Sequence, residues 1–446
     1  MTSGSNGFKP AALVVGGGIA GIQAALDIAD AGFQVYLVER SPSIGGRMSQ
    51  LDKTFPTLDC SACILTPKMV DAGRHPNIEL LTYSEVVSLG GQAGDFHAVI
   101  KKKPRYVDIN KCRGCGLCAE ACRLSGRVLS DFNAGISKRA AVYVPFPQAV
   151  PLVYTVDPEA CVYLTRGVCG KTFKCADACT AEAIDMTQTE QYLEVDVSTV
   201  VVATGFDVFD PHLKPEFGYG VYPEVITTLE FERLASASGP TAGKIVLNGK
   251  TPKKVIFIQC VGSRDYTLGL PNCSRVCCMA VAKQAHLAHD RLPGAEITVF
   301  YMDVRAFGKG FEEFYDRVRN EGIHYRRGNP SEIVKRGERV VVRAEDTLLG
   351  ELVEEEADLV VLAVGMQPRQ GTDRLAEALN LVRGNDGYFL EKHPKLNTVE
   401  SSVPGIFLAG CCQGAKDIPD TVSHAKAAAS ATMILLADKG AGHAAN

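Results

Sequence analysis

Residues 11–32 read AALVVGGGIAGIQAALDIADAG, an apolar run followed by three glycines and then apolar residues at helical spacing. We predict a strand over 11–15, a tight turn within the glycine pattern of residues 16–21, and a helix over the IQAALDIADAG that follows. A G-x-G-x-x-G pattern between a strand and a helix is the fingerprint of a dinucleotide site. Gly16 permits the turn, Gly18 lets the backbone approach a pyrophosphate, and Gly21 lets the helix pack closely on the strand. The helix N-terminus then faces the phosphate charge.

The residues after this unit favour a flavin over a nicotinamide nucleotide. The next apolar run, FQVYLVER, predicts a second strand that ends at Glu39, where a carboxylate can bond ribose hydroxyls. Residues 39–47 follow the E-R-x-x-x-x-G-G arrangement that is typical of flavoproteins with two dinucleotide-binding domains. The first domain is therefore predicted to hold FAD.

Two later strands are similar to the other contact strands of such flavoproteins. VVVATGF (200–206) ends in Thr204-Gly205, and GIFLAGCC (405–412) ends in Gly410-Cys411. Cys411 stands where an acidic residue is usual and would place a thiol beside the ribityl chain. The last helix, TVSHAKAAASATMILLA, either aims its N-terminus at the flavin ring or simply closes the fold. The predicted FAD contacts are Gly16, Gly18, Gly21, Glu39, Arg40, Gly45, Gly46, Arg47, Thr204, Gly205, Gly410 and Cys411.

Twelve of the sixteen cysteines form three sets, two of which lie between residues 104 and 187. The first follows C-x2-C-x2-C-x3-C, the spacing with which ferredoxins hold a cubane cluster, and the second follows the looser C-x7-C-x5-C-x3-C. Zinc is the alternative, but zinc sites often include histidine, and there is none between residues 98 and 211. In two-cluster ferredoxins the fourth cysteine of each set binds the other cluster. The predicted ligands are Cys112, Cys115, Cys118 and Cys179 for one cluster, and Cys161, Cys169, Cys175 and Cys122 for the other.

The third set lies in a second β-α-β unit, formed by KKVIFI (253–258), a helix, and EITVFYMDV (296–304). The turn after the first of these strands reads QCVGSR (259–264) and lacks the glycines of a nucleotide site. Ligands bind at the carboxyl ends of parallel strands, so a cluster is predicted to occupy this position instead. The alternative is four buried cysteines without metal. The predicted ligands are Cys260, Cys273, Cys277 and Cys278.

Composition excludes several classes of protein. The formal net charge of −4 gives no basic field, so we expect no nucleic-acid partner. No stretch reaches the ~18–20 apolar residues that a membrane span needs, and the first residues do not form a secretion signal. Sixteen cysteines then indicate a reducing, cytoplasmic location with metal or redox roles.

Four stretches resemble one known family, that of the heterodisulfide reductase A subunits. They are LDCSACILTPKM (58–69), YVPFPQAVPLVY (143–154), QCVGSRD…CSRVCCMAVAKQAH (259–286) and LAGCCQGAKDIPDTV (408–422). The resemblance implies FAD, a two-cluster ferredoxin insert, and a C-x12-C-x3-C-C cluster. It also implies that Lys283 lies near flavin N5 and stabilises an anionic reduced flavin, the alternative being an ordinary surface lysine. Full-length members carry further cluster domains at both ends, so the chain resembles a short form.

The predicted fold is α/β, with two thioredoxin-reductase-like, Rossmann-like dinucleotide-binding domains and an inserted α+β two-cluster ferredoxin domain. The FAD domain is expected at 1–105, 188–245 and 371–446, the insert at 106–187, and the second Rossmann-like domain at 246–370. Cys60, Cys63, Cys411 and Cys412 fall outside the three sets. We expect structural thiols at these four positions, with a redox dithiol or a cluster shared with a partner as alternatives for Cys60 and Cys63.

The resemblance implies an oxidoreductase with one FAD and three 4Fe-4S clusters that acts as an electron-transfer hub. FAD exchanges electrons singly or in pairs and a cubane exchanges one, so the expected role is flavin-based bifurcation or confurcation. The expected partners are other subunits of a heterodisulfide-reductase-like complex, with hydrogenase, dehydrogenase or ferredoxin components, around a homodimer. Two alternatives are a conduit in a quinone-linked membrane-associated complex and a self-sufficient NAD(P)H-dependent flavin oxidoreductase. The missing second glycine motif argues against the latter.

Overall fold

A seven-stranded sheet forms the larger part of the molecule in the computed structural model, which describes residues 10–170 and 172–444. Its order is β22-β23-β24-β11-β1-β2-β3, and the five strands from β24 to β3 are parallel. The predicted first strand is confirmed as β1 (Ala11–Val15), and the predicted first helix as α1 (Ile19–Asp30). The other strands are β2 (Gln34–Glu39), β3 (Ile78–Thr82), β11 (Thr199–Val202), β22 (Glu391–His393), β23 (Asn397–Ser401) and β24 (Ile406–Leu408).

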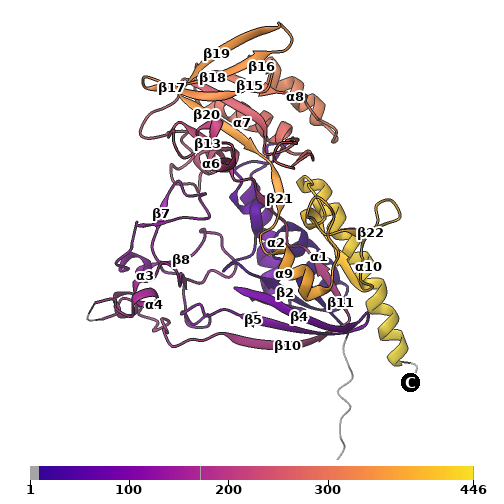
Figure 1. Ribbon diagram of the computed structural model, residues 1–446. Coiled ribbons are helices and arrows are strands. Elements are labelled where there is room, and N and C mark those ends of the chain that lie inside the picture. The colour runs from indigo at the N-terminus through magenta and orange to yellow at the C-terminus, as the bar shows by residue number, and fades with distance from the viewer. Residues whose placement is uncertain (1–9, 171, 445–446) are drawn as a thin grey trace, which may run out of the picture.

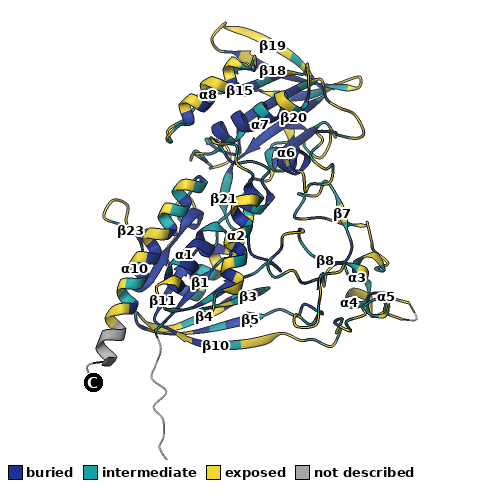
Figure 2. Ribbon diagram, turned by 180° about the vertical axis from the view of Figure 1, so that it is seen from behind, coloured by how far each residue is buried: buried dark blue, intermediate teal, exposed yellow. Residues whose placement is uncertain are grey.

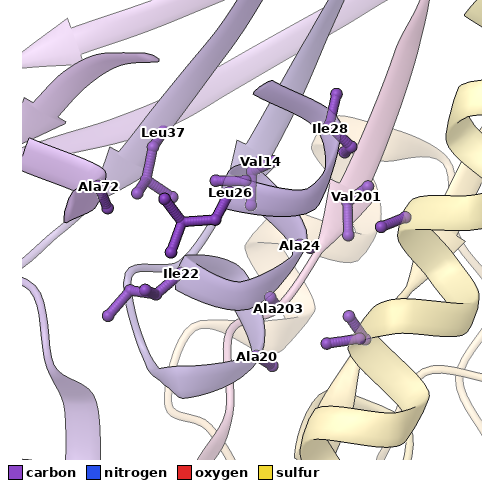
Figure 3. Packing of buried hydrophobic residues seen from close by; sticks show 14 of the residues in the cluster. Val14, Ala20, Ile22, Ala24, Leu26, Ile28, Leu37, Ala72, Val201 and Ala203 are labelled. Carbon is purple, nitrogen blue, oxygen red and sulfur yellow. The ribbon is translucent and has the colours of Figure 1, made fainter. Parts of the chain in front are cut away.

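Helices α1, α2 (Ser61–Arg74) and α10 (Ile418–Ala444) pack with this sheet. Figure 3 shows that Ile22 and Leu26 of α1 lie toward Leu37 and Ala72, while Ala20 lies near Ala203. The small residues of α1 permit close contact with the strands, and the larger ones fill the space beside them. This apolar cluster fixes the start of α1 at the carboxyl end of β1.

The second sheet contains only parallel strands, in the order β13-β20-β14-β15-β16. The predicted strands and helix are confirmed as β14 (Lys254–Val261), β15 (Glu296–Tyr301) and α7 (Cys277–Arg291). The remaining elements are β13 (Val225–Thr227), β16 (His324–Arg327), β20 (Leu359–Val364), α6 (Thr228–Ala235) and α8 (Phe311–Asn320). An antiparallel sheet of β17 (Glu332–Arg336), β18 (Arg339–Asp346) and β19 (Glu351–Ala357) lies at its outer end.

The two sheets are joined by an antiparallel pair of short strands, β12 (Phe206–Val208) and β21 (Met366–Pro368). In Figure 1 this connection lies between the upper lobe, with β14–β20, and the lower lobe, with β1 and β2. Helix α9 (Thr372–Leu379) follows β21 and returns the chain to the lower lobe. In Figure 2 the central strands β1, β11 and β20 are buried, whereas β19 is largely exposed and α8 is exposed on one face.

The cysteine-rich segment connects β5 to β10, which are neighbouring strands of an antiparallel sheet with the order β10-β5-β4. Its strands are β4 (Ser84–Gln92), β5 (Asp95–Lys102) and β10 (Gln191–Val197). The segment between β5 and β10 contains two hairpins and three short helices, which lie to one side of the lower lobe (Figure 1). These elements are β6 (Val128–Leu129), β7 (Lys138–Arg139), β8 (Val142–Tyr143), β9 (Thr155–Val156), α3 (Leu117–Glu120), α4 (Val162–Arg166) and α5 (Lys174–Asp177).

Four short 3₁₀ turns complete the fold: η1 (Gly46–Gln50), η2 (Pro211–Leu213), η3 (Pro215–Phe217) and η4 (Gly410–Cys412). Among residues 10–170 and 172–444, no helix combines the length and apolar character that a membrane crossing requires.

Candidate functional site

A cavity of about 860 Å³ lies between the two lobes, at the carboxyl ends of β1, β2 and β11. Its walls come from both sheets and from the first turn of α10. Gly21, Gly45 and Gly410 are not part of its wall. The predicted FAD contacts that line it are Gly16, Gly18, Glu39, Arg40, Gly46, Arg47, Thr204, Gly205 and Cys411.

The turn after β1 has room only for glycine at two positions. Gly16 adopts a φ of +112°, and a Cβ there would lie 2.4 Å from the Ala203 carbonyl oxygen. A Cβ on Gly21 would lie 1.8 Å from the Gly16 carbonyl oxygen, so this glycine lets α1 approach the turn. Gly18 is the N-cap of α1 and lines the cavity, which places the helix N-terminus at the cavity wall. An anionic phosphate is the group that such a terminus stabilises.

Glu39 is buried at the end of β2 and lines the cavity. One carboxylate oxygen accepts a hydrogen bond from the Gly17 amide and the other from the Ser41 amide, both at 2.7 Å. These two bonds fix the carboxylate beside the glycine turn. Each oxygen keeps a further lone pair for a ligand hydroxyl.

An ion pair between Arg47 and Asp207 connects the glycine-rich turn to β12, with a separation of 2.9 Å. The Gln370 amide also donates to Asp207, at 2.8 Å. Burial alone would raise the pKa of Asp207, but the Gln370 amide and the cations of Arg369 and Arg47 outweigh it and hold the pKa below its usual value. Arg40 donates to the Gln370 carbonyl oxygen at 2.8 Å. This side of the cavity is cationic because Arg40, Arg47 and Arg369 all line it.

Three buried polar atoms in the cavity wall have no hydrogen-bond partner among the described residues: Arg47 Nε, Thr204 Oγ1 and Gln284 Oε1. Buried polar groups are normally satisfied, so unpaired ones at a cavity indicate a ligand. The glycine turn, the helix terminus and Glu39 provide the groups that bind a dinucleotide. The residues present therefore fit FAD.

Lys283 of α7 lies in the cavity wall and is only 2% exposed, so it is not an ordinary surface lysine. Its Nζ donates to the Glu232 carboxylate and to the Lys53 carbonyl oxygen, the latter at 2.9 Å. Gln284 and the Asp52 amide also donate to Glu232. An ammonium group has three N–H donors, so one remains for a group in the cavity.

In the insert, Cys118 of the first set lies near Cys179 of the second set as well as near Cys112 and Cys115. Burial, together with these neighbouring sulfurs, raises the pKa of Cys118 to about 12. Cys179 lies far along the chain from the other three, and it reaches them because α5 packs against α3.

The second set repeats this pattern. Burial, together with the nearby sulfurs of Cys122, Cys161 and Cys169, raises the pKa of Cys175 to about 11. Several sulfurs in one buried site disfavour free thiolates but suit a polynuclear iron site, where iron neutralises them.

The third set gathers where β14 meets α7. Cys277 and Cys278 begin α7, Cys260 lies on β14 with a φ of +62°, and Cys273 lies in the loop between them. Burial, together with the nearby sulfurs of Cys278 and Cys273, raises the pKa of Cys260 to about 11. Burial also raises the pKa of Cys277, helped by the same neighbours.

Helix α7 separates the third cysteine set from the cavity. Val276, Ala280 and Lys283 line the cavity, and their spacing places them on one helix face. The two cysteines at its start project from other faces, and Cys277 Sγ lies 4.0 Å from the carbonyl oxygen of Val364, a further cavity residue. One layer of side chains thus lies between the two sites.

Within the described ranges, no group of three or more His, Cys, Asp or Glu side chains is placed to hold a metal ion. Ligands of one zinc ion must all lie about 2.0–2.3 Å from a common centre. The ligands of a cubane bind different irons and lie further apart. The chemistry of the three sets, four cysteines each without histidine or carboxylate, fits 4Fe-4S clusters.

The expectation of structural thiols at Cys60 and Cys63 is wrong, because the two residues form a disulfide. Cys60 caps α2, and its sulfur accepts a hydrogen bond from the Cys63 amide at 3.2 Å. The C-x2-C spacing at a helix start brings the sulfurs together. Cys411 and Cys412 are buried free thiols, as expected.

The sequence did not point to Glu232 or Lys416 as cavity residues, or to Asp207 as the partner of Arg47. Glu232 reaches Lys283 through tertiary contact of α6 with α7, which no local pattern encodes. Lys416 lines the cavity beside Cys411, and burial lowers its pKa. Lys416 belongs to the stretch QGAKDIPDTV (413–422), which leads into α10, and this stretch was the part of the sequence that could have identified it.

Comparison with known proteins agrees with this geometry. Residues 12–58 match the family model of FAD dependent oxidoreductases, and residues 277–429 match that of pyridine nucleotide-disulphide oxidoreductases. The T. acidophilum thioredoxin reductase aligns with a TM-score of 0.53 at 14% identity, covering 96% of this chain and 98% of that one. The Lactococcus lactis thioredoxin reductase aligns with a TM-score of 0.52 at 13% identity, covering 96% and 100%. The fold and cavity define a flavin-dependent oxidoreductase of thioredoxin-reductase-like architecture.

The chain is similar over about 95% of its length to A subunits of heterodisulfide reductase. It is 54% identical over 431 residues to the second iron-sulfur A subunit of CoB–CoM heterodisulfide reductase from Methanopyrus kandleri, an alignment that covers 96% of this chain and 64% of the relative. It is 51% identical over 427 residues to the A subunit of H(2):CoB-CoM heterodisulfide,ferredoxin reductase from Methanothermobacter thermautotrophicus, covering 95% and 63%. The chain thus spans less than two thirds of the length of these relatives.

Proposed function

We propose that this chain is an electron-transfer hub of a heterodisulfide-reductase-like complex, with FAD in the cavity and three 4Fe-4S clusters at the cysteine sets. The observation that supports it most is the position of α7. This helix lines the cavity with Lys283 and begins with Cys277 and Cys278. A flavin and a cluster held there would lie on opposite sides of one helix.

FAD would supply two-electron and one-electron chemistry and the cubanes one-electron steps, which is the requirement for flavin-based bifurcation or confurcation. In this proposal, Gly16, Gly18 and the start of α1 bind the pyrophosphate, and Glu39 orients the ribose. The other predicted contacts in the cavity wall would line the rest of the cofactor, and the start of α10 faces the cavity through Ile418 and Thr421.

Lys283 would direct its third N–H into the cavity, toward the flavin ring. Its other two donors are fixed by Glu232 and Lys53, so the ammonium is held in one position. A cation fixed there stabilises negative charge on a reduced flavin and can donate a proton to it. Water has little access, because the lysine and its carboxylate partner are both buried.

The segment between β5 and β10 would form a cluster module, with residues 106–187 as its proposed bounds. It would carry electrons between the flavin domain and other subunits. The names of the relatives imply such subunits, and for this chain we propose partners of the hydrogenase, dehydrogenase or ferredoxin type around a homodimer, in the cytoplasm.

The test is analysis of anaerobically purified protein followed by reconstitution with partner subunits. We expect about one FAD and about twelve irons per chain, which corresponds to three four-iron clusters. NADH and NADPH should fail to bleach the flavin, because the turn after β14 lacks the nucleotide-binding glycines. Turnover of a small substrate by the isolated chain at about 1–10³ s⁻¹, rates typical of complete enzymes, would contradict the hub role.

A further inference from the structure

Gln259 carries an unsatisfied donor directly beside the third cysteine set. It precedes Cys260 on β14 and is 3% exposed. Its Oε1 accepts a hydrogen bond from Cys278 Sγ at 3.5 Å, while its Nε2 has no partner among the described residues. A buried donor without a partner destabilises the folded state. With protonated thiols, therefore, the oxygen of this amide has a hydrogen-bond partner and its nitrogen has none among the described residues.

The orientation of this amide suits only a protonated sulfur. The Cys278 thiol donates its proton to Oε1 and shows a second contact of the same kind with the Asp303 carbonyl oxygen, at 3.7 Å. A sulfur bound to iron carries no proton, so it can only accept. Rotation of the amide by half a turn exchanges its oxygen and nitrogen at nearly the same positions. The orphaned Nε2–H would then point at the Cys278 sulfur.

We propose that Gln259 donates a hydrogen bond from Nε2 to the Cys278 sulfur when an iron–sulfur cluster occupies the third set, and thereby raises the reduction potential of that cluster. The inference rests on the proposed function, which places the cluster there. Reduction adds negative charge to the cluster and its sulfurs, so a donor stabilises the reduced form more than the oxidised form. Gln259 is a positioning residue in this scheme, because it acts through Cys278.

The first test is a redox titration of Gln259→Leu and Gln259→Glu, followed by EPR of the reduced clusters. Leucine removes the donor, and a carboxylate of the same shape replaces it with an acceptor. We expect the reduction equilibrium of one cluster to fall about tenfold in Q259L, which is about 59 mV for a one-electron couple, and further in Q259E. The other two clusters should be unchanged. Tyr266→Phe is the matched control, since Tyr266 lies in the loop between β14 and α7 that also carries Cys273, and is 83% exposed. The cluster potentials of this variant should equal those of wild type.

The second test uses wild-type protein grown with glutamine whose side-chain nitrogen is ¹⁵N. Pulsed EPR of the reduced protein should detect coupling between one cluster and a ¹⁵N nucleus, which disappears in Q259L. A full iron content with no coupling and no shift in potential would overturn the role of Gln259 and leave the proposed function intact. Protein with four irons fewer than expected, and cysteines of the third set open to alkylation, would overturn both.

Discussion

The Lys283 ammonium and the Glu232 carboxylate form an ion pair in which the two side chains are 2% and 3% exposed. The pair joins α6 to α7 at the wall of the flavin cavity. Hydrogen bonds from Lys283 to the Lys53 carbonyl oxygen and from the Asp52 amide to Glu232 connect it to the segment between η1 and α2. Charges this deeply buried are stable only as a pair. Glu232 therefore fixes the position of Lys283.

Substitution of Glu232 by glutamine should lower the free energy of unfolding by about 3 kcal/mol, since removal of one partner leaves the other charge buried and unpaired. Chemical denaturation followed by circular dichroism would measure it. Lys250→Met is the control, because the Lys250–Glu338 pair is 76% and 88% exposed and should contribute less than about 1 kcal/mol. Equal effects of the two substitutions would show that the buried pair has no special role.

Double substitutions should distinguish crossed from sequential cluster ligation. With crossed ligation, Cys118→Ala with Cys179→Ala removes ligands of one cluster only, so about four irons are lost. Cys118→Ala with Cys122→Ala would damage both clusters of the insert and remove about eight. Iron analysis after anaerobic purification gives the answer, and the reverse order of losses would establish sequential ligation.

The Arg47–Asp207 pair should produce a defined dependence of stability on pH. The pKa of Asp207 is depressed below its ordinary value of 3.8, so its stabilising contribution is fully present above that value. It is lost as the pH falls through the lower folded-state pKa. The difference in unfolding free energy between wild type and Asp207→Asn should thus be constant from neutral pH down to about pH 5 and shrink below about pH 4. A difference that grew on acidification would contradict this sign.

The Cys60–Cys63 disulfide should be reducible without unfolding, because Cys63 is exposed at the start of α2. Dithiothreitol followed by alkylation and mass spectrometry should label Cys60 and Cys63 under native conditions. Cys411 and Cys412 are 7% and 3% exposed and should stay unlabelled, which makes them the internal control. Labelling of all four together would mean that the reductant unfolds the cavity wall.

Much of the fold follows from local sequence. The run AALVV predicts β1 residue for residue, and the glycines after it are required by the Ala203 and Gly16 carbonyl oxygens that crowd the turn. The strands around the third cysteine set are also evident from their apolar runs. These features depend on neighbours along the chain, which is the information a single sequence contains.

Features that depend on distant parts of the chain could not be predicted in this way. Glu232 pairs with Lys283 only after α6 packs against α7, and Asp207 meets Arg47 only once β12 is paired with β21. The C-x2-C spacing of Cys60 and Cys63 is compatible with thiols, a disulfide or metal ligands. Only the backbone at the start of α2, which brings the Cα atoms within 5.2 Å, selects the disulfide.

The double role of α7 limits how the molecule can move. Rotation of the lobes about the β12–β21 connection would change the shape of the cavity. Lys283 and Cys277 would nevertheless move together, because both belong to helix α7. Their spacing would therefore stay the same in every lobe orientation. A change in the distance from Lys283 to Cys277 of the third cysteine set therefore requires α7 itself to bend.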